Sequence, residues 1–495
     1  MMKFRTHSKP KLLIPLAMAV LVGLCVALST CKAAPGKIYY VAPDGMDSNT
    51  GTIWFPFRTI QHCLDVVQSG DTCLIRGGTY YESLVLRRSG SVTARITIKN
   101  YNGESVSVNS GGSRTLTVSG RLGYYTIEGL SFLTSGSGEQ ADGNVDLKGN
   151  VWAGETAKEG GNDGFVLRDC YVQGTIKFYG HHNLVEGCEV DGMNKKWATG
   201  IYDHFGPSHH NTYRNNVIHG FSGRGIWSMS YTENILVENN RVFDCSTMGI
   251  DLDGASHAVR NSIVKGNEIA NIIGAQGVGI LLENAFDCVI EGNLIHDVGH
   301  EGIQIFNYGQ GCGHWADNEY RDDHTNTVLK NNIIYNVYGG DKGGINAYSV
   351  RGIYVYGNTI HNARGGGILL NQHCGWQCQD WIIENNIFTD NDQTIKIYGG
   401  TSGLDISHNL YYPASSVSNP GSNSIFSDPQ FVNAQNHDFH LQSISPAKDA
   451  GATISYLTDD FDGNLRPQGA GFDIGAYEFG GDTNYNHTTR TIHSM

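Results

Sequence analysis

The sequence predicts an all-β fold, a right-handed parallel β-helix solenoid with an N-terminal capping helix and a C-terminal capping module. Two recurring signatures and the composition predict this fold. An Asn motif and a Gly-Ile pair both recur at intervals of about one coil. Of the 495 residues 64 are Gly and only 17% are charged, which is typical of an ordered, turn-rich chain with a polar surface.

The first signature is a six-residue motif that reads Arg-Asn-Asn-Val-Ile-His at 214–219. Its Asn recurs every 23 to 28 residues, apart from one short turn and one gap of 39, and Cys170 and Cys188 occupy the same position upstream. The positions are Asn216, Asn240, Asn267, Asn293, Asn332, Asn358, Asn386 and Asn409. A buried Asn at a sharp corner can hydrogen-bond the Asn above and below it and satisfy backbone groups of the turn. We therefore expect a structural Asn ladder without a catalytic role.

The second signature is a Gly-Ile pair that opens an alternating strand in each period. The pairs begin at Gly200, Gly225, Gly249, Gly279, Gly302, Gly344 and Gly367. Two to three strand signals fit into each period, so one period is one coil. Coils stacked about 4.8 Å apart bury columns of Ile and Val that no single coil can bury alone. A leucine-rich repeat fold is the alternative, because it has the same period. In this sequence, however, Ile and Val dominate, and the helix on the convex side of a leucine-rich repeat is missing.

Both ends of such a stack expose strand edges and need a cover. Residues 57–67 have the pattern of an amphipathic helix, which suits an N-terminal plug. The periodicity lapses after Asn409, and 427–479 has the character of a capping module. We therefore expect a signal peptide at 1–34, the β-helix with its N-terminal cap at 35–413, a capping module at 414–480 and a disordered tail at 481–495.

The N-terminus has the order of a secretory signal peptide. Lys3, Arg5, Lys9 and Lys11 precede an apolar run at 12–28, and small residues end the segment at Ala33 and Ala34. The alternative is an uncleaved membrane anchor, although the apolar run is short for a bilayer span. We therefore expect a secreted, periplasmic or cell-surface protein.

The formal net charge of −14 excludes a strongly basic footprint. Nucleic acid and anionic membrane surfaces both require such a footprint, so we expect neither as a partner after signal cleavage. An anionic polymer can still bind through local Arg and Lys or through a metal bridge. The expected state is a monomer.

Export permits disulfides. Cys63 and Cys73 flank one short helix-to-strand unit, and Cys374 and Cys378 share one loop, with Cys312 in a neighbouring one. These are candidate disulfides. Metal binding is the alternative, but the Cys374 and Cys378 pair lacks a second close pair.

Two stretches carry a resemblance to a known family. Residues 39–52, with Thr59-Ile-Gln and the segment 70–80, resemble the N-terminal part of secreted pectate-lyase-like β-helix proteins. Asp462-Gly-Asn-Leu-Arg-Pro467 and 473–479 are similar to their terminal module. The resemblance implies the fold across nearly the whole mature chain but not one activity, because the superfamily includes lyases, polygalacturonase-like hydrolases, alginate epimerases and proteins without known activity. Tyr202-Asp203-His204 lies near the place of the epimerase Asp-Pro-His-Asp motif but lacks its Pro, and the multi-Asp signature of polygalacturonases is incomplete.

Residues that alternate with the inward-facing Ile of each strand face outward and form a column through the coils. Successive coils contribute Tyr202 and His204, Trp227 and Met229, Asp251 and Asp253, Leu281 and Glu283, Gln304 and Phe306, Asn346 and Tyr348, and Leu369 and Asn371. Aromatic faces stack on sugar rings and short polar groups bond to hydroxyls. We therefore expect substrate binding by Tyr202, Trp227, Gln304, Asn346 and Tyr348, with an ordinary solvated sheet as the alternative.

The centre of the column is acidic. Asp251, Asp253 and Glu283 are expected within one coil of each other, so they must share a proton or bind a cation. A Ca²⁺ held by these three carboxylates would bridge to a uronate and make its C5 proton removable, with His204 or Arg224 as the base. Lysis and epimerisation both begin with that step.

A hydrolase would use the same acidic residues differently, with Asp253 and Glu283 as a carboxylate pair. The absence of a strongly placed Lys or Arg at the middle of the column counts against a lyase, and the family resemblance counts for it. We predict a secreted lyase for a uronate-containing polysaccharide, with a glycoside hydrolase, a C5-epimerase and a non-catalytic glycan-binding surface protein as alternatives.

Two long loops follow the column and are expected to form cleft walls. The segment 309–326 carries Trp315 and Tyr320, and 372–380 carries Trp376; both Trp residues are predicted to contact substrate. Harmless insertions are the alternative. Solvated turn residues are expected rather than ligands at His209, His210, His296 and His361.

Overall fold

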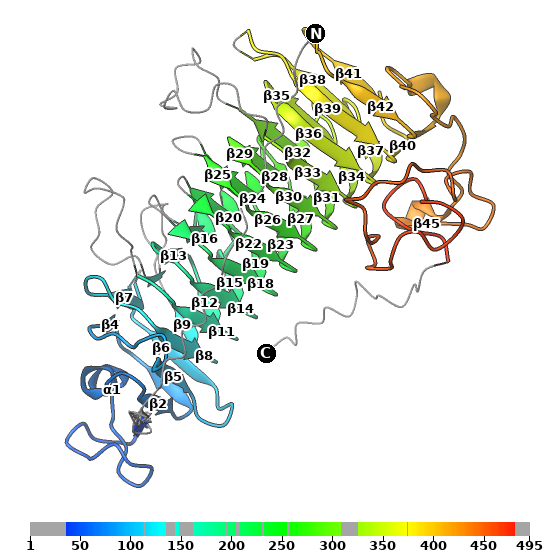
Figure 1. The fold of residues 1–495 in the computed structure, drawn as a ribbon. Helices are drawn as coiled ribbons and strands as arrows, with labels where there is room; N and C mark the ends of the chain where they lie inside the picture. The colour runs from blue at the N-terminus through cyan, green and yellow to red at the C-terminus, as the bar shows by residue number, and fades with distance from the viewer. Residues whose placement is uncertain are drawn as a thin grey trace, which may run out of the picture. The chain divides into compact units, whose positions relative to one another are not determined.

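Three parallel sheets form the structure, and successive coils of the chain contribute one strand to each sheet in turn (Figure 1). The structure is a computed structural model and describes residues 36–112, 114–134, 144–147, 162–194, 196–203, 208–229, 232–254, 258–307, 325–373 and 375–480. These residues belong to one unit that begins at Gly36. The predicted signal peptide and C-terminal tail lie outside the described residues. Within the described chain, none of the helices has the length and apolar character needed to cross a membrane.

The first sheet, sheet A, has fourteen strands. They are β1 (Ile38–Val41), β2 (Thr72–Ile75), β5 (Ile96–Asn100), β8 (Tyr125–Glu128), β11 (Val166–Arg168), β14 (Leu184–Glu186), β18 (Thr212–Arg214), β22 (Leu236–Glu238), β26 (Ile263–Lys265), β30 (Val289–Glu291), β33 (Thr327–Lys330), β36 (Arg351–Tyr356), β39 (Gln379–Glu384) and β42 (Asp405–Ser407).

Sheet B follows in each coil and has thirteen strands. They are β3 (Gly78–Tyr80), β6 (Val106–Asn109), β9 (Ser131–Leu133), β12 (Tyr171–Gln173), β15 (Glu189–Asp191), β19 (Val217–His219), β23 (Arg241–Phe243), β27 (Glu268–Ile272), β31 (Leu294–Val298), β34 (Ile333–Val337), β37 (Thr359–Ala363), β40 (Ile387–Thr389) and β43 (Leu410–Tyr412).

Sheet C completes each coil and has twelve strands. They are β4 (Leu84–Leu86), β7 (Leu116–Val118), β10 (Val145–Asp146), β13 (Ile176–Phe178), β16 (Thr199–Asp203), β20 (Arg224–Met229), β24 (Met248–Asp253), β28 (Val278–Glu283), β32 (Glu301–Phe306), β35 (Ile345–Tyr348), β38 (Ile368–Asn371) and β41 (Ile395–Ile397). Four two-residue strands between sheets C and A form a short fourth sheet, β17 (Ser208–His209), β21 (Thr232–Glu233), β25 (Val259–Arg260) and β29 (Ala285–Phe286).

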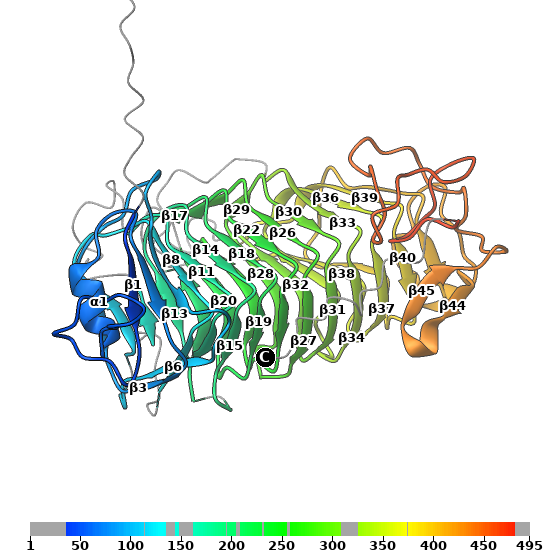
Figure 2. The same cartoon turned by 90° about the horizontal axis from the view of Figure 1, so that it is seen from below.

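This architecture confirms the predicted right-handed parallel β-helix. In the view from below, the strands of neighbouring coils run side by side from α1 at one end to β44 and β45 at the other (Figure 2). The inward positions of the three sheets carry one continuous core of Ile, Val, Leu and aromatic residues. The alternation of buried and half-buried residues in the three-residue strands is the pattern expected when one face of each strand packs inward.

The Asn ladder is present at the corner between sheets A and B. Each amide Nδ2 donates to the Oδ1 of the next Asn, at 2.9 Å from Asn216 to Asn240 and at 2.9–3.0 Å up to Asn409. The same Oδ1 accepts the backbone N–H of the preceding ladder residue, and Cys188 N–H uses Asn216 in this way at 2.9 Å. The ladder therefore satisfies the corner of every coil that it passes through, as predicted.

The residue before each ladder position explains the rest of the motif. It has a left-handed backbone, with φ of 57° at Asn215 and at Asn239 and of 61° at Gly266. Only Gly, and to a lesser degree Asn, Asp and His, adopt this conformation without a large steric cost. The motif therefore varies between Asn-Asn and Gly-Asn.

The Gly of each Gly-Ile pair is required by close packing at the start of sheet C. A Cβ at Gly225 would lie 2.3 Å from Cγ1 of Val242, and one at Gly249 would lie 2.4 Å from Cγ2 of Ile269. The carbonyl of the next Gly of the series would be 2.7 Å away in both cases. Any side chain here would displace the core of the adjacent strand, so the Gly is a packing residue.

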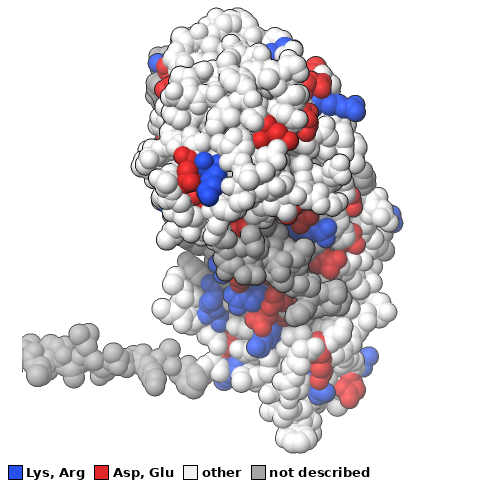
Figure 3. Space-filling model, turned by 90° about the vertical axis from the view of Figure 1, so that its right-hand side faces the viewer, with Lys and Arg blue, Asp and Glu red and all other residues white. Residues whose placement is uncertain are grey.

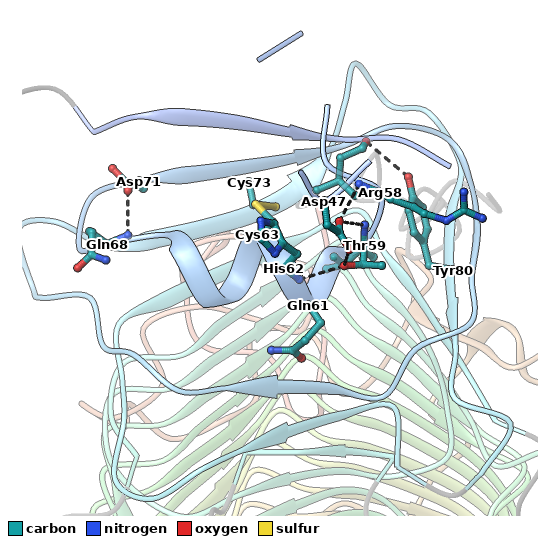
Figure 4. Close-up of a disulfide and its surroundings, with 12 residues drawn as sticks. Asp47, Arg58, Thr59, Gln61, His62, Cys63, Gln68, Asp71, Cys73 and Tyr80 are labelled. Atoms are coloured by element: carbon teal, nitrogen blue, oxygen red, sulfur yellow. Dashed lines mark hydrogen bonds between the residues drawn. A yellow bond between two sulfur atoms is a disulfide. The ribbon is translucent and has the colours of Figure 1, made fainter. Parts of the chain in front are cut away.

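The N-terminal end is covered by α1 (Ile60–Val66), which is shorter than the predicted 57–67 because Thr59 caps it. The Thr59 hydroxyl accepts the N–H of His62, and the Asp47 carboxylate accepts the N–H groups of Arg58 and Thr59, each at 2.9 Å (Figure 4). The predicted disulfide between Cys63 and Cys73 joins α1 to β2. Cys378 is buried, and its predicted partners Cys312 and Cys374 lie outside the described residues.

The solenoid strands end with β43, and the module after it is held by a buried ion pair. It contains the 3-10 helices η2 (Ala414–Ser416) and η3 (Ala434–Asn436) and an antiparallel hairpin of β44 (Phe431–Asn433) and β45 (Asp438–Leu441). Arg466 Nη1 donates to Glu478 at 2.7 Å with both side chains fully buried, and Arg466 Nη2 donates to Asn331 of the solenoid at 3.3 Å. This pair explains why the two C-terminal stretches of the family resemblance occur together.

The outer face of sheet A carries a ladder of charges that alternate in sign along consecutive coils. The residues in register are Glu128, Arg168, Glu186, Arg214, Glu238, Lys265, Glu291 and Lys330. Half-exposed ion pairs join Arg214 to Glu186 at 2.6 Å and Lys265 to Glu238 at 2.9 Å. Each such pair contributes at most about 1 kcal/mol. On the face shown in Figure 3, acidic and basic side chains are likewise interspersed without a large patch of one sign.

Candidate functional site

Sheet C aligns the predicted column in two parallel strips of outward-facing residues. The first, which we call the inner strip, consists of Tyr202, Trp227, Asp251, Leu281, Gln304, Asn346 and Leu369, paired in register on consecutive strands. The second, the outer strip, consists of Met229, Asp253, Glu283, Phe306, Tyr348 and Asn371. The column predicted from the sequence therefore has the residues of this face in the correct order.

The two strips differ in exposure, which the sequence did not indicate. All inner-strip residues except Gln304 are buried, whereas all outer-strip residues except Asp253, which is 7% exposed, are partly accessible. A further row of residues at the start of each strand covers the inner strip. In this row Arg224 lies over Trp227, and Met248 and Val278 pack on Leu281. The outer strip, together with Gln304, is therefore the part of this face that can touch a ligand.

Inner-strip side chains hold those of the outer strip by hydrogen bonds. Trp227 Nε1 donates to Asp253 Oδ2 at 3.1 Å, and Asn346 Nδ2 donates to the phenol oxygen of Tyr348 at 3.0 Å. The Trp227 ring is itself fixed, because it stacks on Tyr202 with 4.5 Å between ring centroids. The predicted substrate-binding residues Tyr202, Trp227 and Asn346 thus support the accessible layer from beneath.

Asp251 forms an ion pair with Arg224 below the surface. Arg224 Nε donates to Asp251 Oδ2 at 2.5 Å, and its guanidinium carbon lies 4.1 Å from the centre of the Trp227 ring. Among the described residues, Asp251 Oδ1 has no hydrogen-bond partner. Burial raises the pKa of Asp251 to about 7, since Arg224 offsets only part of the desolvation and Asp253 adds a like charge. Asp251 therefore titrates near neutral pH.

Two carboxylates of the acidic column already have protein partners. Ca²⁺ takes six to eight oxygen ligands, yet the Arg224 guanidinium already provides the positive charge beside Asp251. Trp227 uses one oxygen of Asp253. Among the described residues, the group that brings three possible ligand atoms within 4.8 Å consists of histidines and lies elsewhere. Of the three carboxylates predicted to hold Ca²⁺, Asp251 is thus paired with Arg224 and Asp253 is bonded to Trp227.

The C-terminal half of the strip surface carries a polar cluster around Tyr348. Lys342 Nζ donates to the Tyr348 phenol oxygen at 2.8 Å, so this oxygen accepts from both Lys342 and Asn346. Asn346 Nδ2 also donates to Glu301, and Glu301 pairs with His300 Nδ1 at 2.6 Å. Burial disfavours the charge of Lys342, but the hydrogen bond to Tyr348 and the nearby Glu301 raise its pKa above the ordinary value, so it stays protonated.

Phe306 lies between the acidic residues and Tyr348 on the outer strip. It is in register with Glu283 on one side and Tyr348 on the other. Its ring lies 5.4 Å from that of Tyr348 and 4.9 Å from that of His373, measured between centroids. A partly exposed ring flanked by polar groups on both sides is a typical platform for a sugar ring.

The remaining predicted residues fall in different places. Gln304 is on the inner strip, 3.4 Å from Glu301. Trp376 is 47% exposed in the turn that pairs with His373, so its loop reaches the outer strip through His373. His204 and Trp315 lie outside the described residues.

Three residues of this face were not predicted from the sequence: His300, Glu301 and Lys342. His300 and Lys342 lie in the turns before β32 and β35, and Glu301 opens β32. All three precede the outward-facing positions that strand alternation predicts. Arg224, which was predicted as a candidate base, is paired with Asp251 at the start of β20, and Lys342 adds a second cation beside Tyr348. A signal existed for Glu301, since it occupies the same register as Arg224 one residue before the Gly.

A stack of three-strand coils with an Asn ladder, one hydrogen-bonded polar strip and capped ends defines a right-handed parallel β-helix protein. The chain belongs to the right-handed β-helix family. The family described as a right handed beta helix region matches residues 157–312 and 260–433, and the one described as a Pel9A-like, right handed beta helix region matches 39–215. This confirms the resemblance to pectate-lyase-like β-helix proteins.

Three similar proteins extend the comparison. The uncharacterized protein YwoF of Bacillus subtilis (strain 168) is 26% identical over 473 residues, which cover 83% of this chain and 92% of that protein. Pectate lyase PEL9 of Emericella nidulans is 41% identical over 69 residues, 14% of this chain and 17% of that enzyme. The structure of XylC in complex with xylose has a TM-score of 0.52 at 12% identity and covers 89% of this chain and 98% of that one, so it shows a shared fold.

Proposed function

We propose that this protein is a secreted, monomeric polysaccharide lyase that cleaves a uronate-containing glycan by C5 proton abstraction and β-elimination. The observation that carries the proposal is the Tyr348 phenol oxygen, which accepts hydrogen bonds from Lys342 and Asn346 beside the Phe306 platform. Two donors on one phenol oxygen, one of them cationic, hold this oxygen in a fixed position beside the platform, where it can exchange a proton with a bound sugar.

In the proposed reaction a uronate stacks on Phe306 with its C5 hydrogen toward Tyr348. The Tyr348 phenolate takes the C5 proton, and the electron pair of the C–H bond forms the C4=C5 double bond while the C4–O bond breaks. The leaving oxygen takes a proton from an acid on the other side of Phe306, a role that we give to Glu283. Lys342 supplies positive charge beside the base and favours approach of the uronate carboxylate.

Two kinds of similarity support this chemistry. A Pel9A-like family matches the N-terminal third of the chain, and the short 41% identical segment belongs to a pectate lyase. Pectate is an anionic polymer, and Lys342 gives the face a cation that such a polymer can approach.

Hydrolysis is the second candidate, because Asp253 and Glu283 are direct neighbours on adjacent strands. The spacing of strands in a sheet is about 4.8 Å, close to the separation of about 5–5.5 Å between the carboxyl groups of retaining glycosidases. In that reaction Glu283 protonates the leaving oxygen and Asp253, held by Trp227, is the nucleophile.

The test is incubation of the purified full chain with pectate, alginate and neutral glycans, with and without EDTA. The proposal predicts an unsaturated, ultraviolet-absorbing product from a uronan, lost in Glu283→Gln and retained in the control Glu238→Gln on sheet A. Reducing ends without the chromophore would replace the lyase by the hydrolase. Exchange of the C5 hydrogen in D₂O without cleavage would identify an epimerase, and no product or exchange from any glycan would refute catalysis. Loss of activity only in EDTA would support the calcium prediction.

A further inference from the structure

Two His-His pairs stand 28 residues apart in the sequence, at His181 and His182 and at His209 and His210. This interval is one coil of the solenoid, so the two pairs fall on top of each other. His181 and His182 lie in the turn between β13 and β14, and His209 and His210 lie at the end of β17, in the corresponding turn of the next coil. The sequence predicts solvated turn residues at His209 and His210, and the structure brings them together with the earlier pair.

The four imidazoles form one cluster between sheets C and A. The rings of His181 and His209 stack with 3.6 Å between centroids, and those of His182 and His210 stack at 5.0 Å. Nδ1 of His209 lies 2.9 Å from Nδ1 of His210. One ring nitrogen each of His182, His209 and His210 lies within 4.8 Å of the others.

The backbone of the two coils fixes this arrangement. The His209 N–H donates to Nδ1 of His181 at 3.2 Å, and the His182 N–H donates to the His209 carbonyl at 3.1 Å. The His210 N–H donates to the carbonyl of Glu233 on the following coil at 3.0 Å. His181 is therefore a support for the cluster, while His182 and His210 are exposed and present their rings to solvent.

The surroundings of the cluster favour a cation. The Asp163 carboxylate accepts the His181 N–H at 2.9 Å on one side, and Glu233 is in register with His209 on the other. In the absence of a ligand, three imidazoles at this separation repel each other whenever more than one is protonated. An ion bonded to the ring nitrogens removes that repulsion.

We infer that His182, His209 and His210 form a binding site for a late first-row divalent metal ion, with Zn²⁺ as the first choice. Imidazole nitrogen is the preferred ligand of Zn²⁺, Cu²⁺ and Ni²⁺, whereas Ca²⁺ takes oxygen ligands. Two nitrogens bound to one Zn²⁺ at about 2.0–2.1 Å in tetrahedral geometry stand about 3.4 Å apart. The separation of 2.9 Å between His209 and His210 is close to this value, and rotation of the exposed His182 ring completes the set.

Three protein ligands leave one position of a tetrahedral Zn²⁺ open. Because His182 and His210 are exposed, that position faces solvent and accepts water or an anionic oxygen. The site is separate from the outer strip of sheet C, and it does not depend on the proposed lyase activity.

Zn²⁺ titration of the untagged full chain by calorimetry tests the site, with Co²⁺ absorption as a second reading of the coordination. The wild type is expected to bind one Zn²⁺ and to give the intense visible bands of Co²⁺ in a tetrahedral nitrogen site. The double substitution His182→Asn and His210→Asn should weaken binding by about 100-fold or more. Asn suits both positions because their φ values are 56° and 59°.

His408→Asn is the matched control, since His408 has a φ of 52° and lies at the corner before Asn409, away from the cluster. It should bind Zn²⁺ as the wild type does. The inference is overturned if the wild type binds no stoichiometric Zn²⁺, if its Co²⁺ spectrum is that of the hydrated ion, or if the folded double variant binds like the control. The wild-type Co²⁺ spectrum decides the matter even if the double variant does not fold.

Discussion

Removal of one rung of the Asn ladder provides a quantitative test of the fold, and Asn332 is the most informative choice. Its side chain is fully buried and makes four hydrogen bonds. Oδ1 accepts the backbone N–H of Asn293 at 3.1 Å and Nδ2 of Asn293 at 2.9 Å. Nδ2 donates to the Ile290 carbonyl at 2.8 Å and to Asn358 Oδ1 at 2.9 Å.

The substitution Asn332→Ala leaves these partners unequally affected. The backbone N–H of Asn293 loses the acceptor that Asn332 provided, while its side chain keeps the Val264 carbonyl at 2.9 Å, and Asn358 Oδ1 keeps the backbone N–H of Asn332. An orphaned buried donor costs about 1–3 kcal/mol, and each weakened partner adds about 1 kcal/mol. The Ile290 carbonyl also loses a donor, which makes three weakened partners, so we expect Asn332→Ala to lower the free energy of unfolding by about 4–6 kcal/mol.

Urea denaturation of the variant beside wild type measures this change, and amide hydrogen exchange at Asn293 locates it. The control is Asn436→Ala, an exposed Asn in η3 whose loss should alter stability by less than about 0.5 kcal/mol. An Asn332→Ala protein as stable as the control, with unchanged exchange at Asn293, would show that the ladder does not support the coils.

Three further predictions concern the site and the module. Asp251 has a pKa of about 7 in the folded protein against about 3.9 in the unfolded chain, so its burial removes stability as the pH rises from about 4 to 7. Asp251→Asn should therefore melt at a progressively higher temperature relative to wild type over that range. A melting-temperature difference that stays constant with pH would contradict the raised pKa of Asp251. Trp227→Phe keeps the aromatic stacking but removes the hydrogen-bond donor to Asp253, so kcat/KM on the identified glycan should fall about tenfold. Unaltered kinetics would contradict the supporting role of Trp227. Glu478→Gln leaves the buried Arg466 without its partner carboxylate and should cost about 3–5 kcal/mol in urea denaturation; unchanged stability would argue against the pair as the anchor of the module.

Much of the fold follows from the sequence because stacking forces chemically equivalent positions into columns. The Asn ladder and the Gly-Ile pairs are visible one coil apart, and each has a local physical cause that acts in every coil. The corner geometry demands an amide at Asn216 and its equivalents, and the entry to sheet C has no space for a Cβ at Gly225. Such repeated constraints leave a periodic trace in the sequence.

The site was harder to predict because it combines residues that are not periodic. The order of residues along the two strips follows from strand alternation. The burial of Asp251 and Asn346, however, depends on Arg224 and Glu301, which lie before the alternating outward-facing positions. Lys342 reaches Tyr348 from a turn whose direction no local pattern encodes. The His cluster is a different case, because its two pairs are visible in the sequence but only the path of the coil between them brings the rings together.

Steady-state kinetics of Tyr348→Phe on the uronan cleaved by the wild type is the most direct test of the proposed function. The substitution keeps the ring beside Phe306 and removes only the oxygen held by Lys342 and Asn346. We predict that formation of the unsaturated product falls about 100-fold or more in kcat, with little change in KM, because proton transfer by a positioned group contributes about 10²–10⁴. Tyr338→Phe, which loses only a surface hydrogen bond to Asp297, should retain full activity. A Tyr348→Phe protein that cleaves the uronan at the wild-type rate would contradict the account.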